Sequence, residues 1–252
     1  MNGLERFIVS VALVLVHAQL GAEPIVLRTA AQEGSAPKFT ESQTGIQGHC
    51  PDIFRALEKA DPLLKVDVAA PSSIKRLETN LKEGRLDIVC ALLETPLRNE
   101  IAHRISTPLF SVRERVVGRV DETLQIRSLK DLADMGELVA TQNGASYTAA
   151  LRGQGVKVDD SSGDSAVALR KLVNGRVRFY YTNEQTGAYY IHAGGLEGQL
   201  RLMPGILQET PSYLWVSRKV DDATLQRLER AVARLHKEGV LDKIYRSYLS
   251  KF

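Results

Sequence analysis

The sequence is poor in metal-binding residues and has no long basic tract. Of its 252 residues, two are cysteine and five are histidine, and no pair of histidines has metal-ligand spacing. The 33 basic and 30 acidic residues are spread along the chain and give a net charge of +3, so no segment can neutralise many phosphates. We therefore expect no metal, no cofactor and no nucleic-acid partner.

Long apolar runs are also scarce. The run near the start, residues 7–16, follows Arg6 and is too short to span a bilayer. Gly21 and Ala22 supply small residues for cleavage before Glu23, which predicts a secretory signal peptide over residues 1–22 rather than a buried N-terminal helix. No cysteine ends this segment, so we expect a soluble, exported protein without a lipid anchor.

Export would place the two cysteines, Cys50 and Cys90, in an oxidising compartment. Two thiols in one half of the chain can form a disulfide there. The other interpretation is a pair of small buried apolar side chains, because free cysteine is among the most buried residue types. The sequence leaves both interpretations open.

A helix followed by a buried strand is the central unit of the first half. Leu77 and Leu81 lie one helical step apart, which predicts an amphipathic helix that Gly84 ends. Residues 86–93 are almost entirely apolar, as in a parallel strand that is covered on both faces. Arg98 therefore stands just past the carboxyl end of a buried strand, where open α/β sheets bind ligands.

The same unit recurs in the second half. Gly175 corresponds to Gly84, and Thr186 at the exit of the second strand corresponds to Thr95. The remaining segments also alternate between strand and helix, which is typical of doubly wound sheets with helices on both faces. We predict two similar α/β lobes.

Six short segments match the motifs of one family in the same order. They are residues 48–53, 81–87, 95–98, 128–132, 143–146 and 239–248. On these segments the chain resembles the family 3 extracellular solute-binding proteins of polar amino-acid ABC transporters. The resemblance covers nearly the whole predicted mature chain.

This resemblance implies a type II periplasmic binding-protein fold, in which two lobes joined by crossing strands close on a ligand. Lobe 1 would comprise residues 23–117 and 212–252, and lobe 2 residues 118–211. The resemblance also implies a periplasmic monomer that captures a small carboxylate, either an amino acid or a related organic acid. Its partner would be an ABC permease or a membrane sensor.

Arg98 aligns with the arginine that binds the ligand's carboxylate in this family, within the motif that begins at Thr95. A guanidinium fork matches a carboxylate in a bidentate way, so the chemistry agrees with this role. Ala145 and Ser146 align with the backbone donors of the second lobe that hold the same carboxylate.

The departures from the family pattern lie where amino-acid binders hold the ammonium group. Asn183 replaces an aspartate and supplies no charge. Leu93 replaces a hydroxyl residue, and Ala91 lies where a small polar residue is expected. We therefore predict a carboxylate ligand that is not a standard α-amino acid. Aromatic residues that would either stack on it or pack in the core are Phe39, Tyr147 and Tyr181.

Two other functions remain open for this fold. An exported enzyme similar to cyclohexadienyl dehydratase would need a carboxylate as acid or base, and Glu184 and Glu94 are the candidates. A docking or sensor partner that has lost ligand binding is the other alternative. We expect a binding protein rather than an enzyme, because no nucleophile–base or metal constellation is visible in the sequence.

Overall fold

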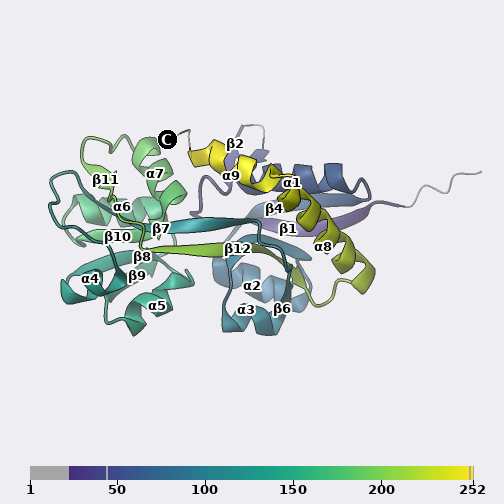
Figure 1. Ribbon diagram of the computed structural model, residues 1–252, viewed down its shortest axis with the longest axis horizontal. Coiled ribbons are helices and arrows are strands. Elements are labelled where there is room, and N and C mark those ends of the chain that lie inside the picture. Colours follow the sequence, from purple (N-terminus) through teal and green to yellow (C-terminus); the bar gives the residue numbers. More distant parts are fainter. Residues whose placement is uncertain (1–22, 44, 250, 252) are drawn as a thin grey trace, which may run out of the picture.

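The computed structural model describes residues 23–43, 45–249 and 251; the predicted signal peptide lies outside them. Two lobes lie next to each other and are linked by two long strands, β7 (Phe110–Arg119) and β12 (Gln208–Ser217) (Figure 1). The chain builds most of lobe 1, crosses to lobe 2 through β7, and returns through β12. The predicted pair of α/β lobes is confirmed.

Lobe 1 contains a parallel pair of strands, β1 and β4, and two apolar clusters. One cluster lies between this pair and α1, α8 and α9, and the other packs α2 and α3 around the buried Trp215 of β12. The elements of lobe 1 are β1 (Ile25–Gln32), β2 (Thr40–Ser42), β3 (Gly45–Gln47), α1 (His49–Ala60), β4 (Leu64–Ser72), α2 (Ile74–Glu83), β5 (Ile88–Leu93), α3 (Pro96–Ile101), β6 (Ala102–Arg104), α8 (Asp222–Lys237) and α9 (Val240–Leu249).

Lobe 2 is a sheet covered by helices on both faces. Parallel strands β8, β9 and β10 have one apolar cluster toward α4 and α5 and another toward α6 and α7. The elements are α4 (Leu129–Asp134), β8 (Leu138–Gln142), α5 (Tyr147–Gly153), β9 (Lys157–Ser162), α6 (Ser165–Val173), β10 (Phe179–Asn183), α7 (Glu184–Ala193) and β11 (Leu200–Leu202).

The crossing strands make the two lobes share one sheet, with the strand order β5–β12–β7–β10–β8–β9. β12 pairs with β5 in lobe 1, β7 pairs with β10 in lobe 2, and both pairings are antiparallel. The crossing strands pair with each other between the lobes, where Gln208 lies opposite Glu114 and Ser212 opposite Phe110. Residues on these strands therefore line the space between the lobes.

The predicted helix stops are confirmed, while the register of the internal repeat is not. Gly84 and Gly175 both follow a helix with a positive φ, 74° and 67°, which glycine adopts without a Cβ clash. At the strand exits, however, the side chain of Thr95 caps α3 and that of Asn183 caps α7. The structural counterpart of Thr95 is therefore Asn183 and not Thr186, because the two helix–strand units differ in length.

Helix α1 begins at His49, earlier than the start near Asp52 that Pro51 predicts. The backbone N–H groups of His49 and Cys50 donate to the carbonyls of Pro37 and Lys38. The loop after β1 thus satisfies donors that a helix start leaves free, and it is fixed against α1.

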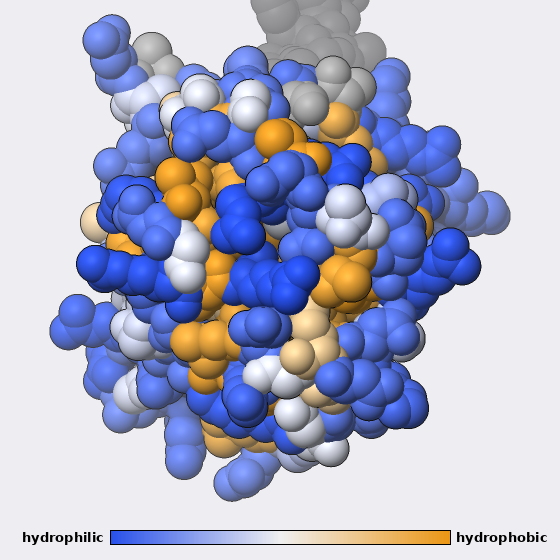
Figure 2. Space-filling model, turned by 90° about the vertical axis from the view of Figure 1, so that its left-hand side faces the viewer, coloured by the Kyte–Doolittle hydropathy of each residue, from blue (hydrophilic) through white to orange (hydrophobic). Residues whose placement is uncertain are grey.

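The outer face of lobe 2 is mostly hydrophilic, with apolar side chains interspersed among polar ones (Figure 2). Large apolar side chains that are exposed in this lobe are Val120, Leu124, Leu138 and Ile206. Single exposed apolar residues are ordinary on soluble domains. Within the part of the chain that the structure describes, no helix has the length and apolar character required to cross a membrane.

Candidate functional site

A cavity of about 90 Å³ lies between the lobes, against the crossing strands. Each lobe and the crossing strand β7 contribute polar side chains to its wall. They include Gln32, Lys38 and Arg98 from lobe 1, Glu114 from β7, and Gln142 and Asn183 from lobe 2.

Arg98 is held rigidly in this wall. The Thr95 hydroxyl accepts a hydrogen bond from the Arg98 backbone N–H at 3.2 Å, which fixes the start of α3. Its guanidinium Nε donates to Glu78 at 2.9 Å, and Nη1 donates to the Leu93 carbonyl at 2.6 Å. Burial lowers the pKa of Arg98 and Glu78 opposes this, but a guanidinium remains charged at neutral pH.

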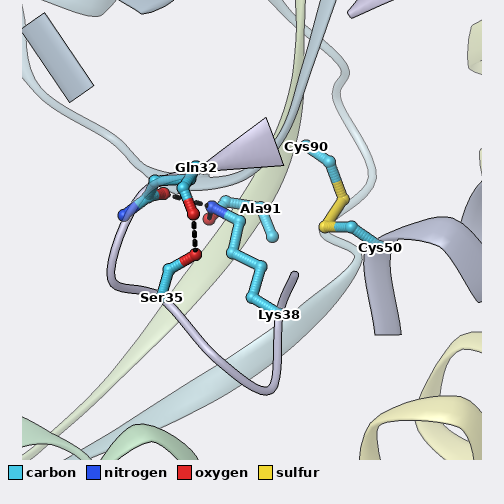
Figure 3. The surroundings of a disulfide bond; sticks show 6 residues. All are labelled: Gln32, Ser35, Lys38, Cys50, Cys90 and Ala91. Carbon is cyan, nitrogen blue, oxygen red and sulfur yellow. Dashed lines mark hydrogen bonds between the residues drawn. A yellow bond between two sulfur atoms is a disulfide. The ribbon is translucent and has the colours of Figure 1, made fainter. Parts of the chain in front are cut away.

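Lys38 brings a second basic group to the same cavity. It comes from the loop after β1, and its Nζ donates to Gln32 Oε1 at 2.7 Å and to the Ala91 carbonyl at 2.8 Å (Figure 3). No carboxylate forms an ion pair with it among the described residues. Burial lowers the pKa of Lys38 well below its usual range, and the charge of Arg98 acts in the same direction.

Ala91 receives this hydrogen bond at an irregular point of strand β5. Its φ is +53°, and the register between β5 and β12 shifts between Tyr213 and Trp215. The neighbouring Cys90 forms a disulfide with Cys50 of α1, so the paired interpretation of the cysteines is the one the structure supports (Figure 3). The bulge and the disulfide together set the position of the carbonyl that Lys38 binds.

Glu114 supplies an acidic group where β7 passes the cavity. Tyr181 donates to Glu114 Oε2 at 2.5 Å, and Thr210 donates to Oε1 at 3.3 Å. Burial raises the pKa of Glu114, and these two hydrogen bonds oppose the rise. Tyr147 covers the ring of Tyr181 with centroids 5.1 Å apart. This group therefore retains a proton at a higher pH than a free carboxylic acid does.

His49 lines the cavity beside the loop that carries Lys38. Its ring stands edge-on to Phe110 with centroids 5.2 Å apart. Burial lowers the pKa of His49 to about 3, and the charge of Lys38 adds to the effect. The imidazole is therefore neutral at neutral pH and adds no charge to the site.

The two lobes touch across the cavity through the loop after β1. Gln142 of lobe 2 donates to the carbonyls of Glu33 and Gly163 at 3.1 and 2.8 Å, and Ser165 donates to the carbonyl of Gly34 at 3.0 Å. Gly34 has a φ of +61°, and a Cβ on it would overlap the carbonyl oxygen of Gly163. The structure thus has the lobes closed on each other, with a glycine at the contact.

Six of the eight ligand-binding residues predicted from the sequence line this cavity. They are Ala91, Leu93, Arg98, Ala145, Ser146 and Asn183. The groups that the resemblance assigns to the ligand are already in use at Ala145 and Asn183: the Ala145 N–H donates to the Gln142 carbonyl, and the Asn183 side chain accepts from the Thr186 N–H.

The other predicted residues lie away from the cavity wall. Thr95 caps the start of α3. Phe39 lines a separate cavity of about 730 Å³, whose wall also includes Tyr189 and Tyr190. Of the aromatics, Tyr147 lines the cleft cavity, while Tyr181 is fully buried behind it. Phe39 and Tyr181 therefore pack in the cores of their lobes.

Glu94 and Glu184, the acid–base candidates, also lie outside the cavity wall. Glu94 accepts from Asn99 and pairs with Arg104 at 3.1 Å. Glu184 is buried at the start of α7, 3.7 Å from Arg115 and 3.9 Å from Arg113. Burial raises the pKa of Glu184, while the two arginines lower it.

Sequence reasoning missed Lys38, Gln32 and Glu114. Lys38 stands in a loop of glycine, serine and proline with no periodic pattern, so nothing local distinguishes it from a solvated lysine. Glu114 is flanked by Arg113 and Arg115, a run of charged residues that is typical of an exposed strand. Burial alternates from Phe110 to Val116, and this alternation would have placed Glu114 on the same face of β7 as Val116.

A model of the family described as bacterial extracellular solute-binding proteins, family 3, matches residues 27–251. The chain belongs to this family. The membership that the motifs predicted is thereby confirmed. No curated protein matches this solute-binding protein.

Solved structures with the same fold include binding proteins and a sensor domain. A putative ABC-transporter binding component from Wolinella succinogenes DSM 1740, complexed with lysine, aligns with a TM-score of 0.76 and 20% identity over 89% of this chain and 95% of that one. A histidine kinase sensor domain similar to periplasmic binding proteins aligns with a TM-score of 0.74 and 20% identity over 90% and 97% of the chains.

A third solved structure is an ancestral amino-acid-binding protein described as a precursor of cyclohexadienyl dehydratase. It aligns with a TM-score of 0.73 and 22% identity over 89% of this solute-binding protein and 95% of that chain. Together these likenesses confirm the two-lobed type II fold. At such identities they describe the fold and not the ligand.

Proposed function

We propose that this protein is an exported solute-binding protein that captures a small carboxylate between its lobes and delivers it to an ABC permease or a membrane sensor. The observation that carries the proposal is Arg98, a buried guanidinium held in the wall of an interlobe cavity. A cation that is fixed before the ligand arrives loses little conformational entropy on binding.

The geometry suggests how capture and closure are linked. The cavity wall combines residues of lobe 1, lobe 2 and the crossing strands, so a ligand inside it contacts both lobes at once. A ligand that contacts both lobes stabilises the closed arrangement over an open one. We propose that the protein is a monomer whose two lobes move relative to each other. Lobe 1 comprises residues 23–117 and 212–252, and lobe 2 comprises residues 118–211.

Delivery to a membrane protein fits the family and the structural likenesses. A permease or sensor that recognises the closed arrangement would respond only to the loaded protein. The similarity to a sensor domain supports a sensor as an alternative recipient. The ABC-transporter component supports a permease.

A thermal-shift screen with amino acids, hydroxy acids, aromatic acids and dicarboxylates tests the proposal. A ligand at 100 times its dissociation constant should add about 2.7 kcal/mol to the free energy of unfolding. We expect a rise in Tm with at least one class of acid, and its loss in Arg98→Ala. Arg76→Ala, at an exposed position of α2, is the matched control and should respond as the wild type does.

Arg98→Ala also removes the partner of Glu78, so the comparison is the ligand-dependent shift and not the Tm of the free protein. Arg98→Lys keeps the charge but not the fork and should give a smaller shift than the wild type. A folded wild-type protein whose Tm responds to no acid would contradict carboxylate capture and favour a docking partner.

A second candidate function is acid–base catalysis of the dehydratase type, which Glu114 favours. This group lines the cavity with a raised pKa, as an acid catalyst requires. If the protein is such an enzyme, wild type converts prephenate and Glu114→Gln binds it without turnover. Binding without product in the wild type would exclude this reaction for this substrate.

A further inference from the structure

We propose that the cavity selects a short dicarboxylic acid without an ammonium group, with one carboxylate at Arg98 and the other at Lys38. This inference rests on the proposed function and names its ligand class. Lys38, which the family motifs do not include, would be the residue that determines specificity.

Lys38 and Arg98 bind carbonyl groups that lie close together on one strand. Lys38 donates to the carbonyl of Ala91, and Arg98 donates to the carbonyl of Leu93, on the same strand β5. Two carbonyls that are two residues apart on a chain lie no more than about 7 Å apart. The carboxyl groups of a diacid with about four to six carbon atoms span a comparable distance.

Lys38 has a hydrogen-bond donor and a charge that its two acceptors do not satisfy. An ammonium has three N–H donors, and Gln32 and Ala91 accept from it. Both acceptors are neutral, whereas Arg98 already has the carboxylate of Glu78. Lys38 is 8% exposed, and a charge at such depth is costly unless an anion accompanies it. A ligand carboxylate supplies both the missing acceptor and the missing charge.

The charges around the cavity disfavour a ligand that carries an ammonium group. A bound carboxylate favours the protonated form of Lys38, and a ligand ammonium would then meet the charges of Lys38 and Arg98 in a cavity of about 90 Å³. The polar groups across from them offer little compensation, because Asn183 is neutral and already caps α7. Glu114 accepts from Tyr181, and burial disfavours its charged form. Like charges at short range in a dry site disfavour an amino acid relative to its ammonium-free analogue.

Lys38 also lies in the loop that closes the cleft. Residues 33 and 34 of this loop accept hydrogen bonds from Gln142 and Ser165 of lobe 2. A carboxylate on Lys38 would hold this loop in its place against lobe 2. The second carboxylate would therefore favour closure as well as adding its own contact.

Isothermal titration with acids matched in length tests the proposal on the purified protein. Glutarate, pentanoate and glutamate share a five-carbon chain and differ in the second carboxylate or the ammonium; malonate, succinate and adipate vary the length. In the wild type we expect one diacid of the series to bind at least about tenfold more tightly than its monoacid and its amino derivative, a difference of about 1.4 kcal/mol.

Lys38→Met should remove this preference by weakening the diacid about tenfold while changing the monoacid less than about threefold. Lys75→Met, at an exposed position of α2, is the matched control and should keep the preference. Lys38→Gln provides a second variant that retains a hydrogen-bond donor without the charge. The wild-type ranking tests the proposal even if neither Lys38 variant folds.

Two results would overturn the inference: a wild type that binds the monoacid or the amino acid as tightly as the diacid, or a diacid preference that survives in Lys38→Met. Either result leaves carboxylate capture standing. A wild type that binds none of these acids, nor any acid of the thermal-shift screen, would instead remove the proposed function as well.

Discussion

Glu114 places a carboxyl group in the wall of the interlobe cavity, beside the phenol of Tyr181. Its folded-state pKa is raised by burial, so the folded protein keeps a proton that the unfolded chain has released above about pH 4.5. A state that binds more protons loses stability as the pH rises. The carboxyl of Glu114 therefore lowers the free energy of unfolding between about pH 4.5 and its raised pKa, and the loss persists above it.

Glu114→Gln should remove this loss. Below about pH 4.5 the variant and the wild type should have similar stability, because both side chains are neutral. Above it the variant should become the more stable, by about 1.4 kcal/mol for each unit by which the folded-state pKa is raised. Thermal unfolding from pH 3.5 to 8 measures this difference.

The exposed Glu100 of lobe 1 supplies the control for this pH series. Glu100→Gln makes the same chemical change at an exposed site and is compared with Glu114→Gln at each pH. A Glu114→Gln variant that is as stable as the wild type at pH 3.5, and equally or less stable than it at pH 7, would contradict a destabilising charge at Glu114.

The disulfide between Cys50 and Cys90 joins two elements that are distant in sequence, helix α1 and strand β5. It closes a separation of 40 residues, and the chain-entropy model gives about 4 kcal/mol for a loop of this size. Reduction of this disulfide should therefore lower the Tm of a chain of this length by roughly 10 °C. Thermal unfolding with and without dithiothreitol measures the change.

A Cys50→Ala/Cys90→Ala variant separates reduction from other effects of the thiol reagent. It should unfold near the Tm of the reduced wild type and should not respond to dithiothreitol. A wild type whose Tm is the same with and without the reagent would show that the crosslink adds no stability.

Local signals predict single elements well and the relations between them poorly. Gly84 reveals a helix end because a glycine acts on its own backbone, and the structure has this helix end. The pairing of Thr95 with Thr186 is wrong, since the strand before Asn183 is shorter than β5. The repeat in the sequence predicts the glycines that follow the two helices, but it does not predict the residue at which each strand ends.

Closure of the whole molecule depends on the absence of a side chain at Gly34. Gly34→Ala would place a Cβ against the carbonyl oxygen of Gly163 in lobe 2. We expect the variant to bind its acid at least about tenfold more weakly, which is about 1.4 kcal/mol. Small-angle scattering should show that added ligand no longer reduces its radius of gyration.

Gly136→Ala is a matched control, because Gly136 also has a positive φ, 68°, but a Cβ there meets nothing within 4 Å. Both variants should lose about 1 kcal/mol of stability from the left-handed backbone. Only Gly34→Ala should lose affinity and compaction. Equal binding and equal scattering in the two variants would contradict a role for Gly34 in closure.

For the site between the lobes, the sequence predicts Arg98 but not Lys38. Arg98 is found because its motif and its place after a strand are local in the chain. Lys38 is not, because its partners Gln32 and Ala91 come together only when the loop after β1 folds back onto β5. The pattern of a loop carries no signal for a contact with a distant strand.

The crosslink beside this loop also bears on when the protein becomes competent to bind. Cys90 precedes the carbonyl that holds Lys38, and Cys50 donates its N–H to the carbonyl of Lys38 itself. In a reducing cytoplasm the thiols stay apart and this corner is less constrained. If the chain is exported as proposed, the newly made protein would bind its acid weakly inside the cell and would acquire full affinity only once Cys50 and Cys90 are oxidised outside the cytoplasm.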